Sequence, residues 1–160
     1  IALRAPMAGD LREVVAALKI SGVVERIGDY AKNIAKRVPL LEGMTNIEPV
    51  SLMPEMARIA TEMVHNVLNA FIERDADAAV RVIERDQAVD DFYNTIFRSL
   101  LTYMMEKPGS IGHSTHLLFI AKNVERVGDH ATNIAEMVYY AATGEYYVER
   151  PRGHDPLTPQ

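Results

Sequence analysis

One segment of this chain occurs twice: Glu25-Arg-Ile-Gly-Asp29-Tyr-Ala-Lys-Asn33-Ile-Ala-Lys-Arg-Val38 recurs as Glu125-Arg-Val-Gly-Asp129-His-Ala-Thr-Asn133-Ile-Ala-Glu-Met-Val138. Nine of the fourteen positions are identical, which indicates an internal duplication. Apolar residues recur three and four positions apart in both copies. Each copy is therefore predicted to lie on an amphipathic α-helix.

Helical periodicity extends outward from both copies, and no segment shows the alternation of a strand. Ser51 is expected to cap the second helix, and Asp75 or Asp77 the third. Because every periodic segment is helical, the predicted fold class is all-α. The short connections predict that consecutive helices are antiparallel neighbours. The four expected helices cover residues 6–42, 51–74, 75–107 and 111–143.

The duplication also predicts the domain organisation. The second copy follows two helices, whereas only a few residues precede the first, and position 1 is Ile rather than Met. We therefore expect an N-terminally truncated pair of tandem three-helix bundles. The first helix should then expose its apolar stripe unless a partner covers it. The expected parts are the last helix of the first bundle (1–42), a linker (43–50), the complete second bundle (51–144) and a flexible tail (145–160).

Composition excludes several classes of protein. The chain has 160 residues, 48% of them hydrophobic and 24% charged, and a net charge of −5, so it lacks the basic surface that a nucleic-acid-binding protein needs. It has no cysteine, so any metal must be held by oxygen or imidazole. No apolar run approaches the roughly 18 residues of a transmembrane helix, and the first residues do not resemble a signal peptide.

The duplicated segment carries Glu, Asp and Asn four residues apart, so their oxygen atoms form one stripe about two helical turns long. The stripe points away from the apolar face of its own helix. Like charges four residues apart destabilise a helix by a few tenths of a kcal/mol, which favours a compensating cation. Magnesium, manganese, calcium and iron suit such oxygen ligands, and zinc is allowed. The stripes are Glu25, Asp29 and Asn33 in one copy and Glu125, Asp129 and Asn133 in the other.

A single helix cannot enclose an ion, so a second helix must contribute ligands. The third predicted helix carries Asp86 and Asp90 four residues apart. If it packs antiparallel to the last helix, these carboxylates meet those of Glu125 and Asp129 in a cluster that could hold more than one ion. Both copies also carry a glycine in mid-helix, at positions 28 and 128, which indicates close approach of another group.

Other interpretations stay open on the residues alone. The acidic stripes could be solvated helix faces with Arg26 and Arg126 as counter-charges, and the chain a purely structural bundle. A metal-dependent hydrolase or oxidase could use the same carboxylates, although no base, nucleophile or pocket can be named for it. Two further sets could contact a metal: Glu62 with His65, the spacing of di-iron bundles, which occurs once, and His113 with His116.

With these residues identified, the chain resembles the PhoU family of phosphate-transport accessory and signalling proteins. The resemblance rests on Pro6-Met-Ala-Gly-Asp10-Leu-Arg12, on the Glu-Arg-x-Gly-Asp-x-Ala-x-Asn-Ile-Ala motif at 25–35 and 125–135, and on Asp86 with Asp90. It implies two three-helix bundles, homodimers, and multinuclear metal clusters of iron or zinc, with magnesium or manganese as alternatives. The implied ligands are Glu25, Asp29, Asn33, Asp86, Asp90, Glu125, Asp129 and Asn133.

The resemblance further implies a regulatory role rather than a catalytic one. Such proteins link a phosphate ABC transporter to a sensor histidine kinase and repress the phosphate-starvation response when phosphate is plentiful. The expected location is the cytoplasm, with peripheral contact to the inner face of the membrane through these partners. No nucleic acid is expected among them.

Overall fold

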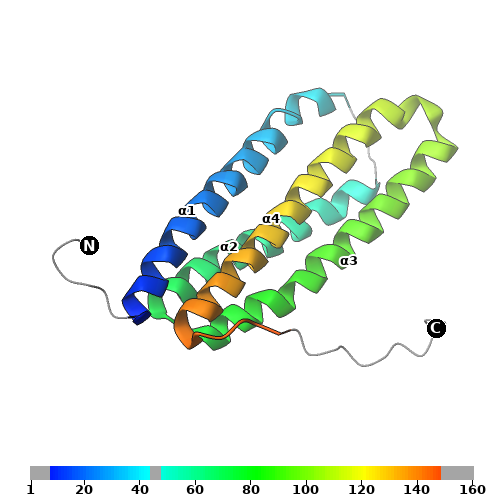
Figure 1. The fold of residues 1–160 in the computed structure, drawn as a ribbon. Helices are drawn as coiled ribbons and strands as arrows, with labels where there is room; N and C mark the ends of the chain where they lie inside the picture. Colours follow the sequence, from blue (N-terminus) through cyan, green and yellow to red (C-terminus); the bar gives the residue numbers. More distant parts are fainter. Residues whose placement is uncertain (1–7, 44–47, 149–160) are drawn as a thin grey trace, which may run out of the picture.

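The computed structural model describes residues 8–43 and 48–148, which form four long α-helices and contain no strand. Short 3-10 helices at Val38–Leu41, Glu48–Leu52 and Pro108–Ser110 lie in the connections. Figure 1 shows the helices running up and down beside one another. The prediction of an all-α fold is confirmed. The long helices are α1 (Ala8–Ala35), α2 (Met53–Glu73), α3 (Ala76–Glu106) and α4 (Ile111–Thr143).

The helix ends follow from local residue chemistry. Arg74, which ends α2, has the left-handed φ of 56°, and the Asp75 side chain accepts a hydrogen bond of 2.8 Å from the backbone N–H of Ala78. Gly144 ends α4 with a φ of 79°, a conformation that glycine adopts without strain. Capping of α2 by Ser51 was a wrong prediction, because Ser51 lies inside a 3-10 turn and α2 begins after Leu52 without a side-chain cap.

The first helix is shorter than its apolar periodicity predicts. It ends at Ala35, and the chain continues through a turn into the 3-10 helix Val38–Leu41. Pro39 explains the difference, because proline has no N–H to donate to residue 35 and disfavours the helical conformation of the residue before it. Residues 1–7, where the helix was expected to start, and residues 44–47 of the expected linker lie outside the described residues.

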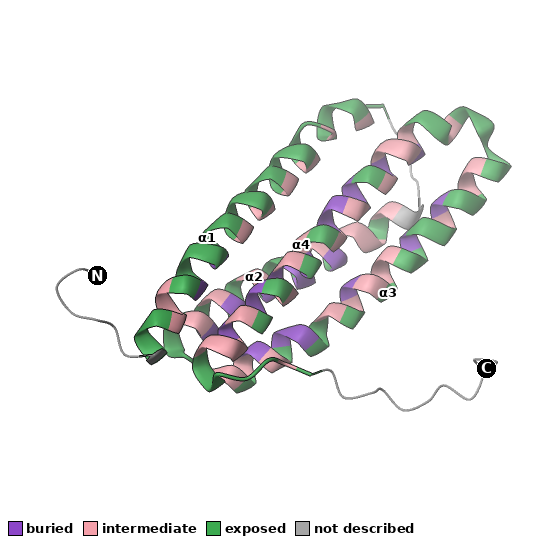
Figure 2. Ribbon diagram, in the orientation of Figure 1, coloured by how far each residue is buried: buried purple, intermediate pink, exposed green. Residues whose placement is uncertain are grey.

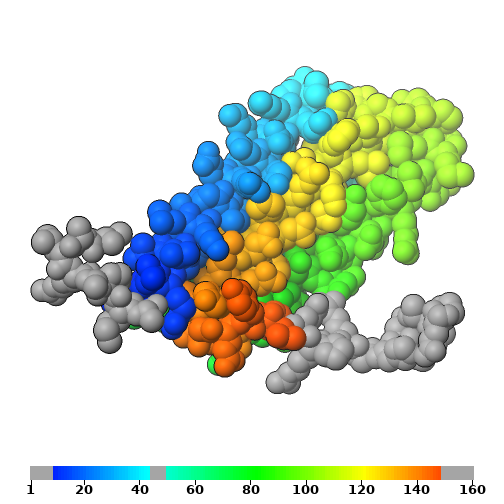
Figure 3. All heavy atoms as spheres, viewed as in Figure 1, coloured from blue at the N-terminus to red at the C-terminus, as the bar shows by residue number. Residues whose placement is uncertain are grey.

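The core lies where α2, α3 and α4 pack together, and α1 lies against α4 on the other side (Figure 2). On the face in Figure 3, α1, α4 and α3 lie side by side. Most of the core side chains are aliphatic, and Met56 and Met63 fill the interior of α2. The larger fully buried residues are Met56, Met63, Val67, Val89, Ile96, Leu100, Ile134 and Val138.

Helix α1 contributes little to this core. Of its described residues only Ala16 and Ile20 are buried, and the part of the predicted stripe at Val24 and Val38 is exposed, Val38 to 56%. Ile27, Ile34 and Leu41 of the same stripe are partly buried against the core, so the predicted exposure of the stripe holds for only part of it.

The segment after Gly144 returns along α4. The rings of Tyr140 and Tyr146 stack with centroids 4.7 Å apart, and those of Tyr139 and Tyr147 meet edge to face at 5.6 Å. The described part of the predicted tail thus packs on α4, and residues 149–160 lie outside the described residues. None of the described helices combines the length and apolarity that crossing a membrane requires.

Candidate metal site

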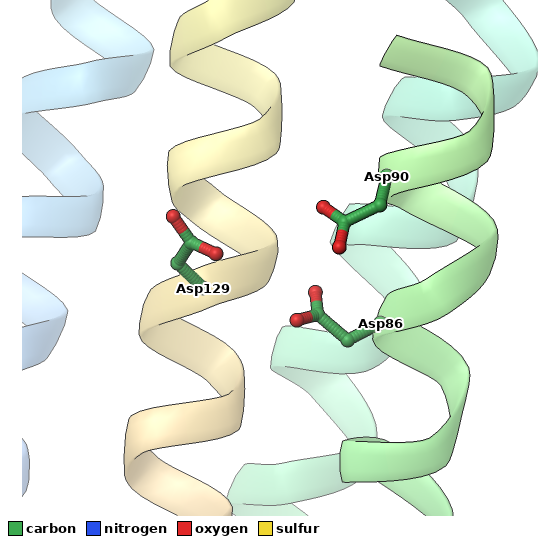
Figure 4. A group of neighbouring side chains, drawn as sticks. All are labelled: Asp86, Asp90 and Asp129. Atoms are coloured by element: carbon green, nitrogen blue, oxygen red, sulfur yellow. The ribbon is translucent and has the colours of Figure 1, made fainter. Parts of the chain in front are cut away.

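Helices α3 and α4 bring three carboxylates together near the middle of the bundle. Asp86 and Asp90, one turn apart on α3, face Asp129 on α4 (Figure 4). One oxygen atom from each of the three lies within 4.8 Å of the other two. Among the described residues this is the one group of three or more potential metal-ligating side chains at such distances. The predicted meeting of the third and last helices is confirmed for these three.

Gly128 explains how α3 approaches α4 so closely. A Cβ atom at this position would lie 2.9 Å from Asp86 Oδ1 and 3.3 Å from Val89 Cγ1. Glycine therefore makes room for the Asp86 carboxylate, as the sequence predicted for a close approach. At Gly28, the equivalent position in α1, no atom lies within 4 Å of where a Cβ would be.

The carboxylates are held where negative charge is unfavourable. Burial, with the nearby charges of Asp90 and Asp129, raises the pKa of Asp86 to about 6. Burial and the charges of Glu125 and Asp90 likewise raise the pKa of Asp129. Asp86 Oδ1 is also buried without a hydrogen-bond partner. A bound cation would relieve the repulsion among the three carboxylates.

Glu125 lies beside this group and forms an ion pair with Lys122. The ammonium of Lys122 donates a hydrogen bond of 2.6 Å to Glu125 Oε1 and lies 2.5 Å from Oε2. Burial alone would lower the pKa of Lys122, but the bond to Glu125 raises it. The sequence analysis missed Lys122, although its spacing three residues before Glu125 is that of a helical ion pair.

The other predicted ligands are not brought to the carboxylate group. Asn133 lines a groove between α1 and α4. Glu25, Asp29 and Asn33 are exposed on α1, and none of them belongs to a group of three potential metal ligands among the described residues.

The two copies of the motif meet at a position where their sequences differ. Tyr30 of α1 and His130 of α4 contact edge to face with ring centroids 5.1 Å apart, and the guanidinium of Arg126 lies 5.8 Å from the Tyr30 ring centre. The sequence analysis did not anticipate this contact, because it considered only the positions at which the two copies are identical. Antiparallel packing of two duplicated helices would have predicted that equivalent positions can face each other.

The alternative metal sets have other partners. Glu62 pairs with Arg58, and His65 is hydrogen-bonded to Asn69 at 3.1 Å. Arg37 donates to His116 Nδ1 at 3.1 Å and stacks over Phe119 at 4.1 Å, which ties the end of α1 to the start of α4.

Comparisons with known proteins agree on one family. The family model described as "PhoU domain" matches residues 1–38 and 53–138. The phosphate-specific transport system accessory protein PhoU homologue of Zymomonas mobilis is 60% identical over 157 residues, which are 98% of this chain and 66% of that protein. The homologue of Caulobacter vibrioides is 50% identical over 95% of this chain and 67% of its own length. The chain thus spans about two thirds of these relatives.

Two crystal structures have the same fold. PhoU from Pseudomonas aeruginosa superposes with a TM-score of 0.83 at 39% identity and covers 90% of this chain and 69% of its own. The phosphate transport system regulatory protein PhoU from Streptococcus pneumoniae gives the same TM-score at 28% identity, covering 90% of this chain and 68% of its own.

Proposed function

The chain belongs to the PhoU family, and on that premise we propose that it regulates phosphate uptake and phosphate-starvation signalling. The proposal is supported by relatives named as accessory proteins of the phosphate-specific transport system and by a similar structure titled a phosphate transport system regulatory protein. PhoU proteins are regulatory accessory proteins and not enzymes, so a hydrolase or oxidase built on the carboxylates is not pursued.

In this role the protein is a helical adaptor in the cytoplasm. It contacts a phosphate ABC transporter and a sensor histidine kinase, and it works as a homodimer. A long helical bundle suits such work, because its faces are rigid and each can carry a different contact.

The adaptor also binds metal at Asp86, Asp90 and Asp129, with Glu125 as a further ligand once it leaves Lys122. The observation that carries this site is that one oxygen atom from each of Asp86, Asp90 and Asp129 lies within 4.8 Å of the other two, although burial makes negative charge unfavourable at Asp86. A donor set made only of oxygen accommodates iron, manganese or magnesium, and zinc is allowed. The ion supplies positive charge that joins α3 to α4. Asn133 lines the groove between α1 and α4, and the stripe of α1 belongs to no group of three potential ligands among the described residues, so neither is part of this site.

Elemental mass spectrometry tests the metal site directly. Untagged protein is purified without chelator, as wild type and as Glu125→Ala/Asp129→Ala. The equivalent double variant Glu25→Ala/Asp29→Ala is the matched control. We expect bound metal in the wild type and in the control, and loss of it in the α4 variant. Equal metal in all three proteins, or none in the wild type, would contradict the site.

The regulatory role is tested in cells. Deletion of the gene is expected to raise phosphate uptake and starvation-gene expression in phosphate-rich medium. The wild-type gene should restore repression, and the Glu125→Ala/Asp129→Ala gene should restore it poorly. Unchanged uptake and expression after deletion would contradict the regulatory function whatever the metal content.

A further inference from the structure

A groove runs between the first half of α1 and the second half of α4, beside the carboxylate group but separate from it. It encloses about 610 Å³ between the two helices, whose meeting face is seen in Figure 3. Its apolar lining includes Val15, Val23 and Met137, and Tyr140 and Tyr146 line the end near the C-terminus of α4. A cavity of this size with an apolar lining is typical of a binding site.

The groove also carries a regular row of cations. Arg12, Lys19 and Arg26 line it along α1, one in every seven residues. Seven residues rise roughly 10 Å along a helix, so the row extends over roughly 21 Å. His130 adds a fourth basic group from α4, and Glu136 is the one acidic residue of the lining. The row is a local feature, because the whole chain has a net charge of −5.

Several groups in the groove have unmet interactions. Leu11 is 52% exposed and Tyr146 79% exposed, which is unfavourable for side chains of this size. Arg12 Nε is buried without a hydrogen-bond partner. The other end of the same helix pair differs, since Arg37, His116 and Phe119 fill it with their own contacts. At the Arg12 end the groove thus leaves cationic and apolar groups available to a ligand, whereas Arg37 at the other end is already engaged.

We propose that this groove binds an acidic amphipathic helix of a partner protein. A helix lying along α1 presents acidic residues spaced by seven at the same roughly 10 Å intervals as the three cations, and its apolar residues cover Leu11, Val15 and Tyr146. Charges at such positions select the partner and its orientation in helical pairs. A single small anion cannot contact cations that are roughly 10 Å apart at once.

A second copy of this chain is a poorer occupant. Its α3 does carry an exposed acidic row with the same spacing, but the exposed neighbours on that side are Arg81 and Gln87, and the apolar ones, Val80 and Ala88, are partly buried, so they offer little apolar surface to Leu11 or Val15. The row consists of Asp77, Glu84 and Asp91.

The test uses the 160-residue chain and three synthetic peptides of about 20 residues and equal length. One peptide places Glu every seven residues beside a leucine stripe, the second replaces each Glu by Lys, and the third scrambles the first. The variant Lys19→Glu/Arg26→Glu reverses two exposed cations of the groove. Lys32→Glu/Lys36→Glu makes the same charge change outside the groove, in the last turn of α1 and just beyond it. Fluorescence anisotropy gives each Kd at about 0.05 M and about 0.5 M salt.

We expect the wild type and the control variant to bind the acidic peptide at least about tenfold more tightly than the scrambled one, and less tightly at high salt. The groove variant should lose this preference and favour the Lys peptide. Equal binding of acidic and scrambled peptides, or unchanged binding by the groove variant, overturns the proposal. The proposal is also overturned if sedimentation shows that Lys19→Glu/Arg26→Glu dissociates a dimer and the control variant does not. In that case a second copy of the chain occupies the groove. Metal content enters neither result, so the metal site and the docking groove stand or fall separately.

Discussion

Helix α4 buries Gly128, Ala131 and Ala135 of the repeated motif between α2 and α3, whereas α1 exposes Gly28, Ala31 and Ala35 at the equivalent positions. Both segments are regular helices of nearly the same sequence. The difference lies in their neighbours: α4 packs against all three other long helices, and α1 packs mainly against α4.

This comparison separates what a motif determines from what its surroundings determine. The motif forms a helix with an acidic stripe in both places. Among the residues that the structure describes, a second helix brings carboxylates to that stripe on α4 and not on α1, and burial there raises the pKa values of Asp86 and Asp129. The proposed metal site is thus a property of the packing of α3 on α4. Changes at equivalent positions of α1 and α4 can test this.

The largest difference is expected between the two mid-helix glycines. Gly128→Val forces a side chain against Asp86 and Val89, so we expect the free energy of unfolding to fall by about 1–3 kcal/mol. Gly28→Val has open space and should change it by no more than about 0.5 kcal/mol. Urea unfolding with a chelator present measures both. If both substitutions change the free energy of unfolding equally, Gly128 is not needed for the close approach of Asp86 to α4.

The next effect is a pH dependence confined to the α4 site. The folded pKa of Asp86, about 6, lies above its ordinary value of 3.8, so its ionised form destabilises the metal-free protein. That penalty is fully present above about pH 6 and disappears as the pH falls toward 4. At pH 7 we therefore expect Asp86→Asn to be more stable than wild type by about 1–2 kcal/mol.

The advantage of Asp86→Asn should shrink at pH 5, where wild-type Asp86 is largely protonated. Urea unfolding of both chelator-treated proteins at a series of pH values measures it. Asp29→Asn on the exposed stripe of α1 is the control, and it should track the wild type at every pH. A constant difference between Asp86→Asn and wild type would contradict the raised pKa.

Removal of Lys122 is expected to have a smaller effect, on metal affinity. Lys122 has no counterpart on α1, where the equivalent residue is Gly22. Its ammonium neutralises Glu125 and competes with any metal ion for that carboxylate. Lys122→Gln should therefore raise the affinity for Mn²⁺ severalfold, or about 1 kcal/mol. Isothermal titration calorimetry with Mn²⁺ measures this. Arg126→Gln is the control, because it removes an equal charge next to Glu125, but the Arg126 guanidinium lies over Tyr30. The Mn²⁺ affinity of this variant should stay near that of the wild type.

Much of the fold followed from the sequence, because helical periodicity, Asp75 as a cap and Gly144 as an end act within a few residues of the chain. The pairing of Asp86 and Asp90 with Asp129 also followed, since antiparallel packing and spacing by four suffice to predict it. The early end of α1 was missed because apolar periodicity was given more weight than Pro39.

What the sequence did not predict depends on contacts between residues far apart in the chain. The place of Asn133 in the groove rather than among the carboxylates depends on how α4 is rotated between α1 and α3. The raised pKa of Asp86 depends on burial, which spacing does not report. The groove itself exists only where α1 and α4 meet, and one of its three cations, Arg12, comes from a motif, Asp10-Leu-Arg12, to which periodicity gave no role.

The smallest expected effect concerns the point where the two copies touch. Edge-to-face contact between Tyr30 and His130 joins α1 to the bundle, and such ring pairs add about 0.5 kcal/mol beyond their buried area. A double-mutant cycle with Tyr30→Leu and His130→Leu should therefore give a coupling energy of about 0.5 kcal/mol by urea unfolding. Tyr30→Leu combined with Tyr103→Leu on α3 should be additive. A coupling near zero for the first pair would mean that α1 is held through its buried Ala16 and Ile20 rather than at the crossing of the copies.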